Sequence, residues 1–275
     1  MRDPRWPRLF VVSLPIGIGL LSFLMIESFA RQMLYPAPPV KVPSPPPAPL
    51  EEVWLDLETG DRVAAWAYQP PGLPEDAPVV LFFHGNGENL ETLRWSRLFE
   101  QLGELGVVVL APDYPGYGRS SGKPSEKGLI ATGDAAVAWA RKTHPGRPLV
   151  VCGWSLGAAL AIATVDRHPE EVRGLIALSA WTTLAEVAVK LFPEFAVKMM
   201  LREHYDSRSI ARRVRVPALV VHGEHDDLIP FAQGKEIASA LAGTVRWVEV
   251  RGAAHNDLLA HRQVWDEMKR FLSGL

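Results

Sequence analysis

The chain has 275 residues, a formal net charge of −2 and 48% hydrophobic residues, which is enough apolar material for one large core. Its positive and negative side chains are interspersed, so no basic stripe indicates a nucleic-acid partner. The single cysteine, Cys152, excludes an internal disulfide, and no group of Cys and His residues has metal-ligand spacing. We expect Cys152 to be a small buried hydrophobic residue rather than a reactive thiol.

Residues 9–26 form an uncharged, mostly apolar run that is long enough to cross a bilayer as a short or tilted helix. Three arginines precede this run and few basic residues follow it, so the positive-inside rule predicts a cytoplasmic N-terminus at 1–8. The prediction is a transmembrane signal anchor at 9–30 in a single-pass membrane protein, with the body of the chain on the non-cytoplasmic side. The alternative is a signal peptide that is cleaved after Ser28-Phe29-Ala30, which gives a secreted protein.

The next segment is dominated by proline. Residues 36–49 contain eight prolines in fourteen positions, a composition that prefers extended polyproline II over a helix or a sheet. We interpret residues 31–50 as a stiff linker, which at about 3.1 Å per residue would hold the following domain roughly 40 Å from the membrane.

The globular domain is expected to cover residues 51–275. Two segments of strand character flank Glu58-Thr59-Gly60-Asp61, which predicts a β-hairpin at its start. Short apolar runs then alternate with helix-like stretches, which predicts an α/β fold with a mostly parallel central sheet and helices on both faces. The six predicted strands after the hairpin are 79–83, 107–110, 149–151, 175–178, 218–221 and 245–250. In such sheets ligands bind beyond the carboxyl ends of the strands.

A Gly-x-Ser-x-Gly motif at 153–157 follows one predicted strand and precedes a small-residue, helix-favouring run. This order predicts a strand, a sharp turn and a helix, with the hydroxyl of Ser155 held out of the sheet as a candidate nucleophile. The backbone N–H of Leu156 would lie at the helix N-terminus, where it can donate to a developing oxyanion. The alternative is that Ser155 only caps the helix.

The loop His84-Gly85-Asn86-Gly87-Glu88-Asn89 follows the strand at 79–83. Its glycines let the backbone approach a ligand closely, so the N–H of Asn86 is the candidate second donor to the oxyanion. We expect His84 to brace this loop through hydrogen bonds rather than to act as a base.

A second loop, rich in Pro and Gly, follows the strand at 107–110. We expect its Asp113 to have a structural role in a rigid turn. Tyr114 and Tyr117 are candidates for residues that line the pocket.

A carboxylate and a histidine follow the last two predicted strands. Asp226 lies in the turn after 218–221, and His255 lies in a loop of small residues after 245–250. A carboxylate at a strand end can orient a histidine and stabilise its imidazolium, and the order Ser155, Asp226, His255 is nucleophile, acid, base. The neighbouring Asp227 competes with Asp226 for this role. The alternative is that both aspartates cap the helix that starts near Pro230.

Taken together, these motifs resemble the α/β-hydrolase superfamily, and within it the membrane-anchored α/β-hydrolase-domain serine hydrolases related to monoacylglycerol lipases and protein depalmitoylases. The resemblance covers residues 51–275 and rests on HGNGEN, DYPGYGRSSGKPSEKG, GWSLG, GEHDDLIP and GAAHND, in that order. It implies a catalytic triad at the positions of Ser155, Asp226 and His255, and oxyanion N–H groups at Asn86 and Leu156. The loop His-Gly-Asn-Gly differs from the His-Gly-Gly-Gly of many esterases and from the His-Gly-Gly-Pro-Gly of proline iminopeptidases.

The segment 179–217 between two core strands is expected to form a small helical cap. Within it, apolar residues recur at helical spacing over 184–200. This apolar stripe would suit an acyl chain, and equally well it could pack on the sheet as ordinary core.

The expected activity is that of a serine hydrolase acting on a carboxylic ester or thioester of a small molecule or lipid, without metal or cofactor. Two alternatives use the same residues: an acyltransferase, and an aminopeptidase-like amide hydrolase that would need Glu186, Glu194 or Glu203 to bind a substrate terminus. A non-catalytic binding module on the same fold is the alternative of a different class.

Overall fold

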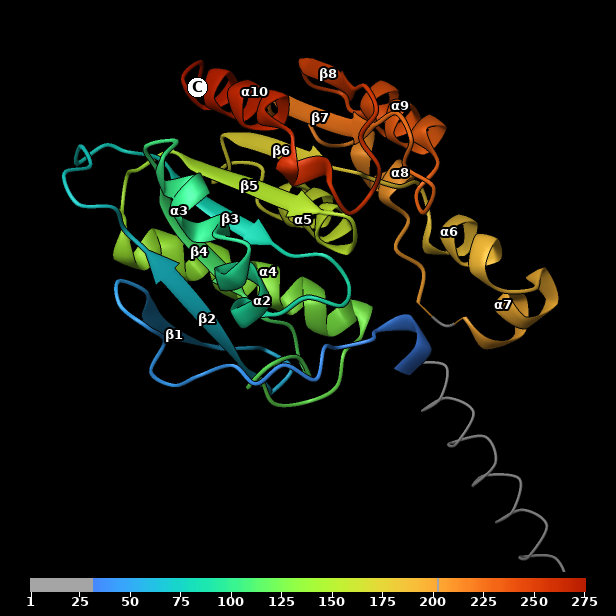
Figure 1. Ribbon diagram of the computed structural model, residues 1–275, viewed down its shortest axis with the longest axis horizontal. Helices are drawn as coiled ribbons and strands as arrows, with labels where there is room; N and C mark the ends of the chain where they lie inside the picture. The colour runs from blue at the N-terminus through green and yellow to red at the C-terminus, as the bar shows by residue number, and fades with distance from the viewer. Residues whose placement is uncertain (1–31, 202) are drawn as a thin grey trace, which may run out of the picture.

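The computed structural model describes residues 32–201 and 203–275, and an eight-stranded sheet runs through the centre of this part of the chain (Figure 1). The strands lie in the order β1-β2-β4-β3-β5-β6-β7-β8. Their bounds are β1 (Glu51–Asp56), β2 (Arg62–Tyr68), β3 (Val79–Phe83), β4 (Val108–Pro112), β5 (Leu149–Trp154), β6 (Gly174–Leu178), β7 (Ala218–Gly223) and β8 (Val245–Val250). The predicted strands are therefore confirmed, with shifts of one to three residues at some ends.

The first two strands form the predicted antiparallel hairpin, in which Glu51 pairs with Ala67 and Asp56 with Arg62. Strand β2 also pairs antiparallel with β4, and every pair from β4 to β8 is parallel. Because parallel strands end at one common edge, the loops after β3, β4, β5, β7 and β8 all emerge there. These are the loops that carry the residues singled out in the sequence.

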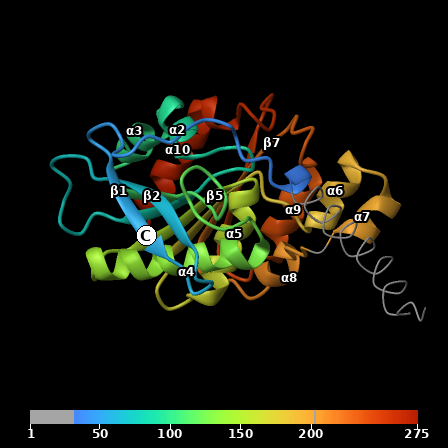
Figure 2. The same cartoon turned by 90° about the horizontal axis from the view of Figure 1, so that it is seen from below.

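Helices cover both faces of the sheet, as Figure 2 shows. Residues Val79, Leu81 and Phe83 of β3 pack into one hydrophobic cluster, and Val80 and Phe82 pack into the other. The first cluster includes α4 (Glu126–Thr143), α5 (Leu156–Arg167), α8 (Ser207–Ala211) and α9 (Phe231–Ala240); the second includes α2 (Leu90–Trp95), α3 (Leu98–Gly103) and α10 (Arg262–Leu272). Burial on both faces explains why these strands are continuously apolar.

The segment between β6 and β7 holds α6 (Leu184–Leu191) and α7 (Glu194–Met200), with α8 after them. The apolar stripe over 184–200 is therefore split, because Pro193 lacks the N–H that an uninterrupted helix requires and disfavours helical backbone at the residue before it. The side chain of Phe195 is 72% exposed, whereas Leu184 is buried. Helices α6 and α7 project beyond the sheet in Figure 1, whereas α8 packs on α5 and α9.

The described part of the segment predicted to be a stiff linker packs on the domain. Tyr35 and Val42 are buried, and the side chains of Asn86 and Asn89 donate hydrogen bonds to backbone carbonyls of this segment. In Figure 1 this chain, in blue ahead of β1, lies along the body of the domain. Extended backbone leaves its carbonyl groups unpaired, so they are available to donors on a neighbouring surface.

Within residues 32–201 and 203–275, no helix has the length and apolar character that crossing a membrane requires. The predicted anchor at 9–30 lies outside the described residues.

Candidate active site

Ser155 occupies a strained turn between β5 and α5. Its backbone has φ 55° and ψ −112°, a conformation that non-glycine residues rarely adopt. The N–H of Ser155 donates to the carbonyl of Leu178 at 2.9 Å, and its own carbonyl accepts a 3.0 Å hydrogen bond from the indole of Trp181. The side chain makes no capping hydrogen bond to α5, so the interpretation of Ser155 as a simple helix cap is wrong.

The two glycines of the motif are required because the turn is crowded by backbone. A Cβ on Gly153 would lie 2.0 Å from the carbonyl oxygen of Gly157, and a Cβ on Gly157 would lie 1.9 Å from that of Phe83. Helix α5 therefore approaches both its own strand and β3 more closely than any side chain allows. This close approach sets the N–H of Leu156, at the start of α5, beside the loop that follows β3.

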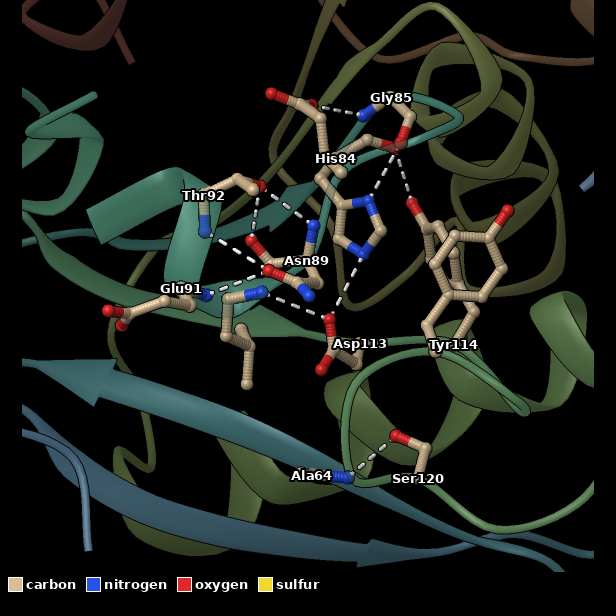
Figure 3. Close-up of polar contacts among 12 residues, drawn as sticks. Ala64, His84, Gly85, Asn89, Glu91, Thr92, Asp113, Tyr114 and Ser120 are labelled. Carbon is tan, nitrogen blue, oxygen red and sulfur yellow. Dashed lines mark hydrogen bonds and ion pairs between the residues drawn. The ribbon is translucent and has the colours of Figure 1, made fainter. Parts of the chain in front are cut away.

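The loop after β3 is braced from behind by His84 (Figure 3). The Nδ1 atom of His84 lies 2.8 Å from the carbonyl oxygen of Gly85 and must donate, because a carbonyl oxygen only accepts. In a trans peptide the N–H points opposite to the carbonyl, so this bond turns the N–H of Asn86 away from His84. The predicted bracing role of His84 is confirmed.

Asp113 supports His84 in turn. Its Oδ1 atom lies 3.4 Å from Nε2 of His84 and accepts a 3.1 Å hydrogen bond from the N–H of Leu90, at the start of α2. Both side chains are completely buried. Burial raises the pKa of the Asp113 carboxyl, and the contacts with His84 and Leu90 offset part of that rise. The structural role predicted for Asp113 is confirmed.

The prediction that Tyr114 and Tyr117 line the pocket is wrong. Both side chains are completely buried and have no accessible surface. The hydroxyl of Tyr114 donates to the carbonyl of His84 at 2.7 Å, and the hydroxyl of Tyr117 donates to Oδ1 of Asn86 at 2.6 Å. The two tyrosines therefore hold the loop in position rather than contact a ligand.

Asp226 and His255 are joined directly, at 2.8 Å between Oδ2 and Nδ1. The other oxygen of Asp226 accepts from the N–H groups of Leu228, at 3.2 Å, and Ile229, at 2.7 Å. Burial alone would raise the pKa of Asp226, but hydrogen bonds from His222 and His255 hold it well below its usual range. Asp226 is therefore an ionised partner for His255.

The alternative roles considered for Asp227, as the partner of His255 or as a helix cap, are wrong. Asp227 is exposed, and α9 begins after Pro230 without any side-chain cap. The sequence analysis missed His222, whose Nε2 lies 3.4 Å from Oδ2 of Asp226 and donates to the carbonyl of Ile229 at 3.0 Å. His222 lies at the end of an apolar strand, four residues before Asp226, and this position could have indicated that the two side chains are in contact.

Trp154 connects the three loops. Its ring stacks on that of His255, with 5.4 Å between ring centroids and 27° between planes, and its Cε3 lies 3.1 Å from where a Cβ of Gly85 would be. His255 thus packs against the residue directly before Ser155. Among the described residues, the Ser155 hydroxyl makes no hydrogen bond.

The fold and this site define an α/β-hydrolase-fold protein. The family model described as the alpha/beta hydrolase fold matches residues 78–208. The chain is similar to alpha/beta hydrolase domain-containing protein 17B of Xenopus laevis, with 30% identity over 73% of this chain and 68% of the relative. It is also similar to an uncharacterized Mycobacterium tuberculosis protein, MT2364, with 33% identity over 97% of this chain and 94% of the relative. The chain belongs to the α/β-hydrolase family.

Solved structures share the fold. An esterase from Pyrococcus furiosus, Pf2001, superposes with a TM-score of 0.70, covering 86% of this chain and 98% of its own, at 20% identity. Est1E from Butyrivibrio proteoclasticus, with ferulic acid bound, gives a TM-score of 0.65 over 80% of this chain and 99% of its own, also at 20% identity. At these identities the likeness shows the fold alone.

Proposed function

We propose that this protein is a serine hydrolase that cleaves a carboxylic ester or thioester through an acyl-enzyme. The observation that carries the proposal is the buried Asp226–His255 hydrogen bond next to the strained turn of Ser155, with His255 stacked on the ring of Trp154, the residue before Ser155. A bonded acid and base close to a nucleophile at the sheet edge is the arrangement that acyl transfer requires. The fold shared with the Pyrococcus furiosus esterase Pf2001 supports the same reaction class.

In the proposed reaction His255 takes the proton of the Ser155 hydroxyl through Nε2 while the serine oxygen attacks the acyl carbonyl carbon. The N–H groups of Asn86 and Leu156 donate to the oxyanion that forms. His255 then gives the proton to the departing alcohol or thiol, which leaves Ser155 acylated. A water molecule, deprotonated by His255, attacks the acyl-enzyme and releases the carboxylic acid.

We further propose a lipid or other acyl substrate at a membrane, because the apolar run at 9–26 precedes the catalytic domain in the sequence. Turnover of p-nitrophenyl esters should increase with acyl length, and a short-chain optimum would contradict the lipid substrate.

The acyltransferase alternative differs from hydrolysis only in the group that accepts the acyl chain. Product analysis with an added alcohol or thiol separates the two reactions.

The central test is Ser155→Ala in the full chain, assayed with a fluorophosphonate probe and a p-nitrophenyl ester. We expect no labelling and a loss in kcat of at least about 10³-fold. Ser179→Ala is the matched control, because Ser179 is a buried serine at the end of the neighbouring strand β6 and also has a positive φ, 45°. Labelling of Ser155→Ala at the wild-type level would show that the nucleophile is wrong.

A further inference from the structure

The segment Leu34–Val42, which we call the strap, contacts the loop that follows β3 at two points. The backbone carbonyl of Leu34 accepts a 2.6 Å hydrogen bond from the side-chain amide of Asn86. The carbonyl of Val40 accepts a 2.8 Å hydrogen bond from the side-chain amide of Asn89. Two asparagines of one loop therefore donate to one stretch of chain that lies about fifty residues earlier.

The bond between Asn86 and Leu34 adds to the support of the Gly85–Asn86 peptide. Behind it, His84 holds the carbonyl of Gly85. Both atoms of the Asn86 side-chain amide are hydrogen-bonded: the oxygen accepts from the Tyr117 hydroxyl, and the nitrogen donates to the carbonyl of Leu34. Asn86 is otherwise exposed, so without the strap one of these two anchors would be replaced by water.

The strap also reaches the nucleophile side of the site. Tyr35 is 4% exposed, and its hydroxyl lies 2.8 Å from that of Tyr205. The backbone N–H of Tyr205 is fixed by a 2.9 Å bond to the carboxylate of Glu126. The Tyr205 ring packs edge-on against Trp181, at 5.9 Å between centroids, and Trp181 donates to the Ser155 carbonyl. The strap thus links the loop of Asn86 with the turn of Ser155.

We propose that the strap is a positioning element of the oxyanion hole, which sets the distance between the N–H of Asn86 and that of Leu156. This inference rests on the proposed function. Donors stabilise an oxyanion only when they are held in advance where the charge develops, and a small misplacement costs rate rather than binding. Asn89 is the residue through which this role can be tested, because it does not touch the reacting atoms.

The decisive variant is Asn89→Asp in the full chain. The Oδ1 atom of Asn89 accepts from the N–H groups of Glu91 and Thr92 and so caps α2, and an aspartate keeps that cap. Only the amide that donates to Val40 is lost, and a carboxylate oxygen then faces the carbonyl. Gln101→Glu, which adds the same charge to the nearby helix α3, is the control.

For Asn89→Asp we expect kcat for a p-nitrophenyl ester and the rate of fluorophosphonate labelling to fall about tenfold or more, with KM within about twofold. Gln101→Glu should keep the wild-type rates. Tyr35→Phe is a second variant, which removes one hydroxyl of the tyrosine pair and keeps the ring; we expect kcat to fall about threefold or more. If Asn89→Asp does not fold, Tyr35→Phe tests the role of the strap in its place.

Wild-type kcat in both Asn89→Asp and Tyr35→Phe would overturn the role of the strap while leaving the serine hydrolase intact. A wild-type chain that the probe does not label would overturn the proposed function, and the inference with it. Because wild-type labelling is measured first, the two failures are distinguishable.

Discussion

Asp226 and His255 lie 29 residues apart in the chain, and a 2.8 Å hydrogen bond joins the carboxylate of one to the imidazole Nδ1 of the other. An ionised carboxylate only accepts, so Nδ1 carries the proton and Nε2 is the nitrogen left to act as a base. The bond is buried, with the Asp226 side chain completely shielded and that of His255 5% exposed. It therefore fixes both the tautomer and the orientation of His255.

Asp226→Asn should remove most of the activity. The amide introduced in place of the carboxylate would favour the His255 tautomer with the proton on Nε2, which cannot accept the proton of Ser155, so we expect kcat to fall about 10³- to 10⁴-fold. Asp227→Asn is the matched control, because its side chain is exposed and should leave kcat within about twofold. Steady-state kinetics on a p-nitrophenyl ester checks both variants. Equal losses in the two would contradict the assignment of Asp226.

The same carboxylate makes stability depend on pH. The pKa of Asp226 is lower in the folded chain than its ordinary value of 3.8, so the folded state binds fewer protons than the unfolded state between these two values. The stabilisation is complete above pH 3.8 and is lost as the pH falls toward the folded pKa, by about 1.4 kcal/mol per pH unit.

Urea unfolding of wild type and Asp226→Asn at about pH 7 and about pH 3 measures this effect. The difference in free energy of unfolding between the two chains should be smaller at the acidic pH. A difference that grows on acidification would show that the pKa of Asp226 is not depressed in the folded state.

Gly157→Ala should disrupt the turn of the nucleophile. Its Cβ would lie 1.9 Å from the carbonyl oxygen of Phe83, and neither backbone can move without displacing β3 or α5. We expect a loss in the free energy of unfolding of about 3 kcal/mol or more, measured by urea denaturation. Gly274→Ala is the control, because a Cβ there would lie 3.6 Å from its nearest neighbours and the effect should stay within about 0.5 kcal/mol. Wild-type stability of Gly157→Ala would show that the close approach is not real.

Tyr114→Phe should destabilise the loop that follows β3. The variant leaves the buried carbonyl of His84 without the 2.7 Å hydrogen bond from the Tyr114 hydroxyl, at a cost of about 1–3 kcal/mol. In Tyr68→Phe the lost hydroxyl has no hydrogen bond within the described residues, so its stability should remain near that of wild type. Thermal and urea unfolding compare the two. An unchanged Tyr114→Phe would mean that the hydroxyl does not support the loop.

Much of the fold could be predicted because its signals are local. The hairpin before residue 69 and the apolar strands from Val79 onward follow from short runs of residues, whose burial on both faces leaves little room for polar side chains. Pro193 marks the break between α6 and α7 in the sequence, yet the helical spacing of apolar residues over 184–200 runs across it. Periodicity alone does not show where a helix ends.

The contacts of Tyr117 and of the strap could not be predicted, because each joins segments whose separation is fixed only when the sheet forms. Tyr117 and Asn86 are 31 residues apart, and Leu34 and Asn86 are 52 apart. The sequence by itself determined the order of strands and helices and the residue types at the strand ends, since these depend on local backbone preference and apolar pattern. Only the tertiary structure decided which aspartate meets His255, that two tyrosines face the loop rather than the pocket, and that the proline-rich segment packs on the domain. Those outcomes depend on distances across the sheet edge, which parallel pairing sets and no local pattern encodes.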